Sequence, residues 1–163
     1  MSSHISSTER AHKLSIQAEK LDETRHYREA FKLLLEAAKL GDTGAQTNLG
    51  NYYAAGKGTK KNLAEAESWY RKAYKAGSSS GANNIACDKR DSGNMRSAIL
   101  WFKKAVAMGY GGSCIELAKI YRTKPGHKRQ VSALLKRVLL MDIYGASEFD
   151  KEQAAAMLAE IKK

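Results

Sequence analysis

The sequence has few of the residues that cross-link a chain or interrupt its helices. Its 163 residues include two cysteines and one proline. Two cysteines are too few for a disulfide scaffold and are typical of a reducing compartment. No apolar run approaches the roughly 20 residues that cross a bilayer, and the opening MSSHISSTER is polar where a secretory signal needs an apolar stretch. We therefore expect one globular domain, residues 1–163, in the cytoplasm, with Cys87 and Cys114 as free thiols.

The sequence also lacks the groupings of residues on which catalysis and metal binding depend. No nucleophile stands beside a base in a recognisable motif, and GKG at 56–58 lacks the preceding strand and the following lysine-serine pair of a phosphate loop. The histidines, His4, His12, His26 and His127, show none of the paired spacing of a zinc motif. We therefore expect no catalytic residue, no metal and no cofactor.

What the sequence does contain is an internal repeat. SWYRKAYKAG at 68–77 returns as LWFKKAVAMG at 100–109, each with apolar or small residues at helical spacing and a final glycine typical of a helix C-terminus. The same frame fits a segment ending at Gly41 and, more loosely, one ending at Gly145. The first small or apolar residue of this frame recurs at Ala30, Ala66, Ala98 and Leu134, which are 36, 32 and 36 residues apart. This spacing indicates a helical repeat, with Trp69, Tyr70, Trp101 and Phe102 in its core.

A second repeated element lies between these helices. Leu49, Gly50 and Tyr53 stand at the same distances from the preceding glycine as Leu117, Ala118 and Tyr121. The middle unit keeps Ile85 and Ala86 but has Lys89 in place of the tyrosine, and its loop is four residues shorter. A large residue beside a small one, with an aromatic residue one turn later, is typical of a helix packed closely on its neighbour. Each unit is therefore predicted to be a helical hairpin, whose second helix begins after Asn62 or Asn94.

These residues resemble the Sel1-like (Sel-one-like) repeats, which are related to tetratricopeptide repeats. The resemblance extends from about residue 27 to about residue 145 and is carried best by Ala45, Leu49, Gly50, Tyr53, Gly56, Gly58, Ala66, Trp69, Ala73 and Gly77. It implies an all-α protein, a right-handed α/α solenoid of about four helical hairpins plus a C-terminal capping helix. It also implies that the first helix of each hairpin lines a concave surface.

Both ends of the chain are expected to cover the terminal repeats. A helix is predicted at about 7–23, behind a capping box of Ser6 and Glu9, and should pair with the helix that begins near residue 27. A second helix is predicted at about 150–162, capped by Asp150 with Gln153 three residues on. Ala154, Met157, Leu158 and Ile161 should form the stripe that closes the stack.

A helical count places the candidate binding residues opposite the predicted core of the first helices. Residues about half a turn from that core should be exposed, and several are asparagines, which cost roughly 0.5 to 0.7 kcal/mol relative to alanine in mid-helix. Ile115 falls at an equivalent position. A solvated polar face without function is the alternative. The predicted partner-binding residues are Thr47, Asn48, Asn51, Asn83, Asn84, Cys87, Arg90, Glu116, Lys119 and Arg122.

Charge indicates the kind of partner. The formal net charge is +11, and residues 117–141 contain no acidic residue. Such a surface favours an acidic partner. We expect a protein rather than nucleic acid, because no nucleic-acid-reading motif is present and the aromatic residues lie in the core frame. The competing surface is the basic one at Arg71, Lys72, Lys103 and Lys104.

The resemblance implies a non-enzymatic protein-interaction module of bacterial type. Its narrower expected role is that of an immunity protein that neutralises a cognate toxin or effector. A signalling adaptor is the first alternative, and a basic solenoid that binds nucleic acid is the second.

Overall fold

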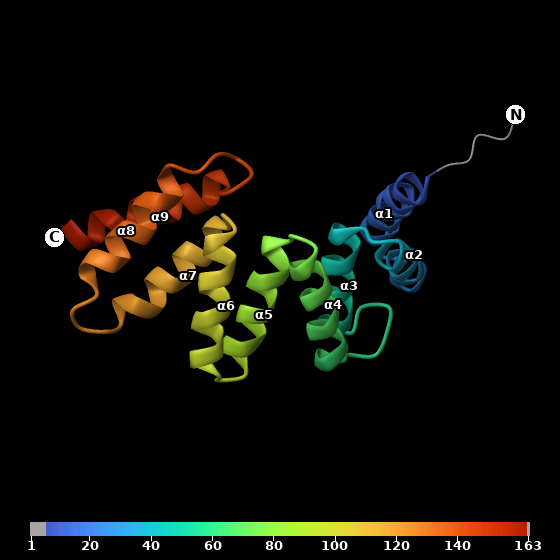
Figure 1. Cartoon of the computed structure of the whole chain (residues 1–163), viewed down its shortest axis with the longest axis horizontal. Helices are drawn as coiled ribbons and strands as arrows, with labels where there is room; N and C mark the ends of the chain where they lie inside the picture. Colours follow the sequence, from blue (N-terminus) through green and yellow to red (C-terminus); the bar gives the residue numbers. More distant parts are fainter. Residues whose placement is uncertain (1–5, 163) are drawn as a thin grey trace, which may run out of the picture. The chain divides into compact units, whose positions relative to one another are not determined.

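The computed structural model describes residues 6–162 of the chain (Figure 1). This part consists of nine α-helices and contains no strand, as the repeat pattern predicts. The helices are α1 (Ser7–Glu23), α2 (Tyr27–Lys39), α3 (Thr43–Ala55), α4 (Leu63–Lys75), α5 (Ser79–Asp91), α6 (Met95–Ala107), α7 (Gly111–Arg122), α8 (Lys128–Leu139) and α9 (Glu148–Lys162). The predicted all-α solenoid, with four hairpins and a further C-terminal helix, is confirmed.

The chain divides into two compact units, residues 1–81 and 82–163, and the division falls within α5. In unit 1, α1 pairs with α2, α2 packs on α3, and α3 pairs with α4. The predicted pairing of the opening helix is therefore confirmed. The core of unit 1 joins small and large apolar side chains, among them Ala18, Leu34, Leu49 and Trp69. The expectation of one domain over residues 1–163 stays a prediction.

In unit 2, α6 packs on α7, α7 pairs with α8, and α9 contacts both α7 and α8. Ala154 and Met157 of α9 are buried, so the C-terminal helix covers the last hairpin as predicted. The two repeated aromatic pairs are buried as well, Trp69 with Tyr70 in unit 1 and Trp101 with Phe102 in unit 2. The prediction that these rings form the core is confirmed.

Most helix ends follow the local signals in the sequence. Ser6 and Glu9 form the predicted capping box, and Asn62 and Asn94 accept hydrogen bonds from backbone N–H groups of α4 and α6. Glu65 does not complete a box with Asn62, because the Asn62 N–H donates to the Tyr53 carbonyl at 2.8 Å. The glycines that follow α2, α4 and α6 have positive φ, as predicted for helix ends.

Two predictions near the C-terminus are wrong. Helix α8 ends at Leu139, well before Gly145, whose carbonyl instead accepts a 2.6 Å hydrogen bond from the Gly111 N–H. Helix α9 begins at Glu148, close to the predicted start, but its cap is Ser147 rather than Asp150. The Ser147 hydroxyl accepts from the Asp150 N–H at 3.1 Å, and the Asp150 carboxylate accepts from the Ser147 N–H at 3.0 Å. Asp150 therefore completes the box from within the helix instead of preceding it.

The hairpin of α3 and α4 depends on a close approach that only glycine permits. A Cβ atom at Gly50 would lie 2.3 Å from Cε1 of the Tyr70 ring. The Tyr70 ring is buried, so it has little room to move away. The two helices can therefore approach this closely because position 50 carries no side chain.

Gly50→Ala should destabilise the protein by about 1 to 3 kcal/mol, the usual cost of overpacking a filled core. The measurement is chemical unfolding followed by circular dichroism. Gly44→Ala, on the same helix, is the matched control. A Cβ atom there would lie no closer than 3.2 Å to a neighbour, Oδ1 of Asp42, so this change should be neutral or stabilising through helix propensity. Equal stability of the two variants would show that the Tyr70 ring accommodates a methyl group.

Candidate protein-interaction site

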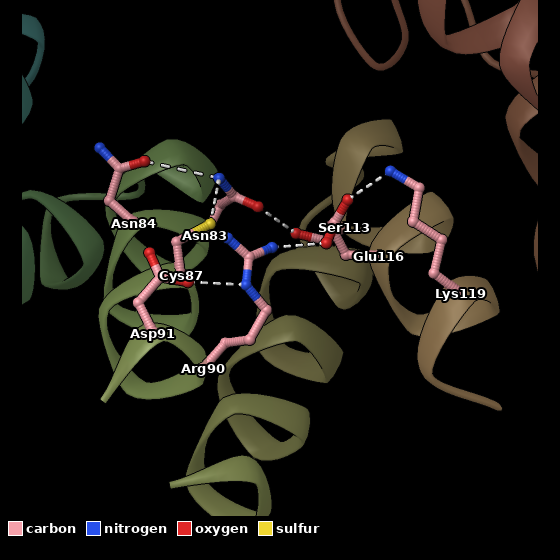
Figure 2. A network of polar contacts seen from close by, with 8 residues as sticks. All are labelled: Asn83, Asn84, Cys87, Arg90, Asp91, Ser113, Glu116 and Lys119. Atoms are coloured by element: carbon pink, nitrogen blue, oxygen red, sulfur yellow. Dashed lines mark hydrogen bonds and ion pairs between the residues drawn. The ribbon is translucent and has the colours of Figure 1, made fainter. Parts of the chain in front are cut away.

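A network of polar side chains joins α5 and α7, the first helices of two successive hairpins (Figure 2). The Ser113 hydroxyl donates to Oδ1 of Asn83 at 2.8 Å, and Ser113 is fully buried. Nδ2 of Asn83 faces Oδ1 of Asn84 at 3.4 Å and Sγ of Cys87 at 3.8 Å. The Asn83–Ser113 hydrogen bond therefore has a structural role, because it joins two hairpins and gives a buried hydroxyl its acceptor.

Ion pairs continue the same network. Glu116 accepts from Nη1 of Arg90 at 2.5 Å and from Nζ of Lys119 at 2.8 Å. Arg90 also donates from Nε to Asp91 at 2.9 Å, and this hydrogen bond raises the pKa of the Arg90 guanidinium. The structure thus brings together six predicted residues, Asn83, Asn84, Cys87, Arg90, Glu116 and Lys119. Arg90 and Lys119 are paired with Asp91 and Glu116, so they add little net positive charge to this surface.

The two cysteines are free thiols, as expected. Burial raises the pKa of the Cys87 thiol and that of the Cys114 thiol. A raised pKa keeps each thiol protonated near neutral pH, and a protonated thiol is a weak nucleophile. Cys87 therefore contributes a weak hydrogen-bonding surface to the network.

The helical count was wrong about exposure at two positions. Thr47 is only 8% exposed, and its hydroxyl bonds to the Thr43 carbonyl at 3.0 Å and to the Ser78 hydroxyl at 3.2 Å. Ile115 is 2% exposed and belongs to the core. The count assumed one buried face, whereas a helix inside a repeat stack also contacts the adjacent hairpin. Residues half a turn from the hairpin core can therefore be buried against a second neighbour.

Asn48 and Asn51 lie in unit 1 on the wall of an open pocket of about 520 Å³. Helix α1 supplies the opposite wall with Glu19, Asp22 and Glu23. Asn51 also accepts a 2.8 Å hydrogen bond from the Tyr70 hydroxyl, so it supports the α3–α4 hairpin. The carboxylates of α1 were missed by the sequence analysis. Their spacing of three and four residues, which places them on one helix face, was the available signal.

One side of this pocket is fixed by a lysine between an acid and two rings. Nζ of Lys57 lies 2.6 Å from Oδ1 of Asp22, 4.4 Å from the Tyr27 ring centroid and 5.2 Å from the Tyr52 ring centroid. The Tyr52 hydroxyl donates to the same carboxylate. The hydrogen bond from Lys57, followed by that from Tyr52, lowers the pKa of Asp22. Burial, together with Asp22, raises the pKa of Tyr52. This cluster ties α1 to α3 and the loop after it.

Arg122, the remaining predicted site residue, is not part of the α5–α7 network. It lies at the end of α7, and its Nη1 is 2.6 Å from Oε2 of Glu160 on α9. Both side chains are largely exposed, at 50% and 64%. The pair is therefore a surface salt bridge of small energetic weight.

The competing basic surface has a structural role that the sequence analysis missed. Nζ of Lys72 lies 3.7 Å from the Trp69 ring centroid, and Nζ of Lys104 lies 3.8 Å from the Trp101 ring centroid. In both repeats the lysine follows the tryptophan by three residues, which places it over the ring on the same helix face. Arg71 is paired with Glu67 at 2.6 Å. Lys72 and Lys104 therefore cover the repeated tryptophan rings, and Arg71 balances the charge of Glu67.

Residues 6–162 contain no group of three or more potential ligands placed to hold a metal ion. His4 lies outside the described residues. None of the helices that the structure describes combines the length and the apolar character needed to cross a membrane.

Comparison with known proteins agrees with the repeat frame. The Sel1 repeat family model matches residues 22–42, 43–78 and 89–110. A Sel1 repeat protein from Oxalobacter formigenes has a similar structure, with a TM-score of 0.70 and 21% identity over 92% of this chain. A protective antigen of uropathogenic Escherichia coli strains that displays an SLR fold has a TM-score of 0.68 and 22% identity over 90% of this chain. The chain spans 62% and 38% of the lengths of these two proteins. No curated protein sequence matches it.

The fold and the repeat frame define an all-α protein of the helical-repeat class. More particularly, the chain is a Sel1-repeat protein. Proteins with Sel1 repeats are generally protein-interaction modules that act as non-enzymatic scaffolds.

The Asn83–Ser113 bond predicts a measurable coupling between two hairpins. Asn83→Ala should destabilise the protein although alanine is the better helix former, because the buried Ser113 hydroxyl loses its acceptor. A double-mutant cycle with Ser113→Ala, measured by chemical unfolding, should give a coupling of about 0.5 to 1.5 kcal/mol. A coupling near zero would mean that the bond is replaced by water at no cost.

The Asp22 cluster predicts a pH-dependent contribution to stability. Because the folded-state pKa of Asp22 is lowered, its contribution is present above the unfolded value of about 4 and is lost as the pH falls through the folded value. Asp22→Asn should therefore destabilise the protein at neutral pH, and the difference from wild type should shrink at pH values below about 4. Urea unfolding at several pH values measures this difference. Glu19→Gln is the control for the loss of one carboxylate from the same helix, because Glu19 has no ion pair among residues 6–162.

Proposed function

We propose that this chain is a non-enzymatic module that binds a partner protein through the first helices of its hairpins. The observation that carries the proposal is the pocket of about 520 Å³ that α1 and α3 line in unit 1. It includes Asn48 and Asn51, which the repeat frame had already singled out as positions opposite the hairpin core. Its volume lies within the range of small binding sites, and its walls are polar above an apolar floor of Ala18 and Leu34.

Three polar side chains of this pocket, those of Glu19, Glu23 and Asn48, are available to a ligand. Within residues 6–162 the Asn48 amide has no hydrogen-bond partner, and Glu19 and Glu23 have no ion pair. Carboxylate and amide oxygens accept hydrogen bonds, so they suit a partner segment that presents N–H donors. Asp22 and Lys57, which hold each other, keep one side of the pocket in place. A partly preformed site of this kind reduces the ordering cost of binding.

Two observations favour a protein partner over nucleic acid. The rings of Trp69 and Trp101 are buried and carry lysines over them, so they cannot serve as platforms for stacked bases. Arg71, Arg90 and Arg122 are each paired with an acidic residue, which reduces their attraction for phosphate. The net charge of +11 still favours a partner with an acidic surface at other positions.

The narrower role we propose is that of a bacterial immunity protein that neutralises a cognate toxin or effector in the cytoplasm. A signalling adaptor that uses the same surface is the alternative. The two roles differ in what binding does to the partner: a neutralising protein abolishes the activity of its partner in a binary complex, whereas an adaptor leaves that activity intact and holds a second protein at the same time.

The test begins with capture of the partner from the native cell and purification of both proteins. Glu19→Ala with Asn48→Ala should raise the Kd at least tenfold, or about 1.4 kcal/mol, with the fold retained because alanine favours helix. Gln17→Ala with Glu152→Ala is the control: it removes one amide and one carboxylate from exposed positions outside the pocket and should leave the Kd unchanged. Equal affinity of the pocket variant and wild type would contradict the proposal.

A further inference from the structure

A second pocket lies in unit 2 and has the opposite electrostatic character. Its volume is about 410 Å³, and α7, the loop after it, α8 and α9 all contribute to it. Three cations and one carboxylate line it above an apolar floor. The residues that matter to its chemistry are Arg122, Lys124, Lys128, Glu160, Tyr121 and Val131.

The pocket carries an excess of positive charge. Arg122 is paired with Glu160, but Lys124 and Lys128 have no acidic partner within the residues that the structure describes. They also lie in the stretch 117–141, which contains no acidic residue. Two unpaired ammonium groups on one pocket repel each other, and an anionic group bound between them relieves that repulsion.

The start of α8 adds to this field. The residue at its cap position, His127, makes no side-chain hydrogen bond to a backbone N–H of the helix, whereas Asn62 caps α4 and Asn94 caps α6. Nδ1 of His127 instead lies 2.6 Å from Oε1 of Gln130. The first backbone N–H groups of α8 therefore have no side-chain acceptor, and the helix dipole places partial positive charge at the same end as Lys128.

The floor selects among anions. Tyr121 and Val131 line the pocket and are buried to more than nine-tenths, and the partly exposed Ile161 beside them adds apolar surface next to the ammonium groups. The face of the Tyr121 ring is stacked on His127, with centroids 5.2 Å apart and an interplanar angle of 13°. Because one face of the Tyr121 ring is covered by His127 and the residue is only 7% exposed, it offers little ring surface for stacking a nucleic-acid base. An aliphatic side chain beside a carboxylate suits both the apolar and the charged part of the pocket.

We propose that this pocket binds an acidic peptide segment of the partner protein, with a carboxylate at Lys124 and Lys128 and a neighbouring apolar side chain on Tyr121 and Val131. The inference rests on the proposed function, since it takes the partner to be a protein, and it names the chemistry of one segment of that partner. It also gives the place on this chain where the acidic surface of the partner, which the net charge of +11 favours, would bind.

The test uses a labelled octapeptide, Gly-Ser-Glu-Leu-Glu-Leu-Gly-Ser, and its glutamine counterpart in fluorescence anisotropy titrations. The full-length protein should bind the glutamate peptide at least tenfold more tightly than the glutamine peptide. Lys124→Gln with Lys128→Gln should lose at least tenfold in affinity. Lys32→Gln with Lys136→Gln removes the same charge from exposed positions outside the pocket and should change affinity less than threefold.

Equal losses in the two double variants would overturn the inference, because net charge alone would then explain binding. A single-stranded oligothymidine that binds more tightly than the peptide, and loses affinity in the Lys124 and Lys128 variant, would overturn it in favour of phosphate. With the purified partner, unchanged binding of that variant together with weakened binding of the Glu19 and Asn48 variant would overturn this inference and leave the proposed function standing.

Discussion

The constraint on which the rest of this structure depends is the short distance between neighbouring helices. At the hairpin centres the residues in the alanine frame, such as Ala66, Ala73, Ala98 and Ala105, are fully buried, and at Gly50 the Tyr70 ring occupies the space of a side chain. Such small residues let the backbones approach, and the larger rings between them then fill the remaining volume. Because these few buried residues set the distance between neighbouring helices, exposed residues can differ from one repeat to the next without changing the packing.

Most of the fold could be predicted from the sequence because its signals are local. Helical spacing, the glycines after α2, α4 and α6 and the asparagine caps act within a few residues, and each repeats with the period of the hairpin. The segment between α8 and α9 was the exception. The repeat frame predicts a helix end at Gly145, but the geometry there is set by the contact of Gly145 with Gly111, more than thirty residues earlier. Sequence spacing carries no signal for such a contact.

The candidate site was less predictable for a related reason. Counting around one helix identifies the side that packs within its own hairpin, but Thr47 and Asn83 bond to residues of the next repeat. The pocket of unit 1 requires α1 and α3 together, so its acidic wall could not be inferred from α3 alone. Likewise, the pairing of Arg90 with Glu116 and of Arg122 with Glu160 follows from tertiary packing. The polar residues of the candidate site could therefore be predicted from the sequence, but the residues that they contact in the folded chain could not.

The packing of α1 on α2, α2 on α3, α3 on α4 and α7 on α8 has a consequence for the order of assembly. These contacts join helices that follow one another in the chain, so each hairpin closes over a short loop and loses little chain entropy. During synthesis a hairpin can therefore form as soon as its second helix leaves the ribosome, and the Asn83–Ser113 bond can form only when the following hairpin emerges. Co-translational folding would then proceed hairpin by hairpin within each unit, and each new hairpin would bury apolar surface of the hairpin before it in that unit.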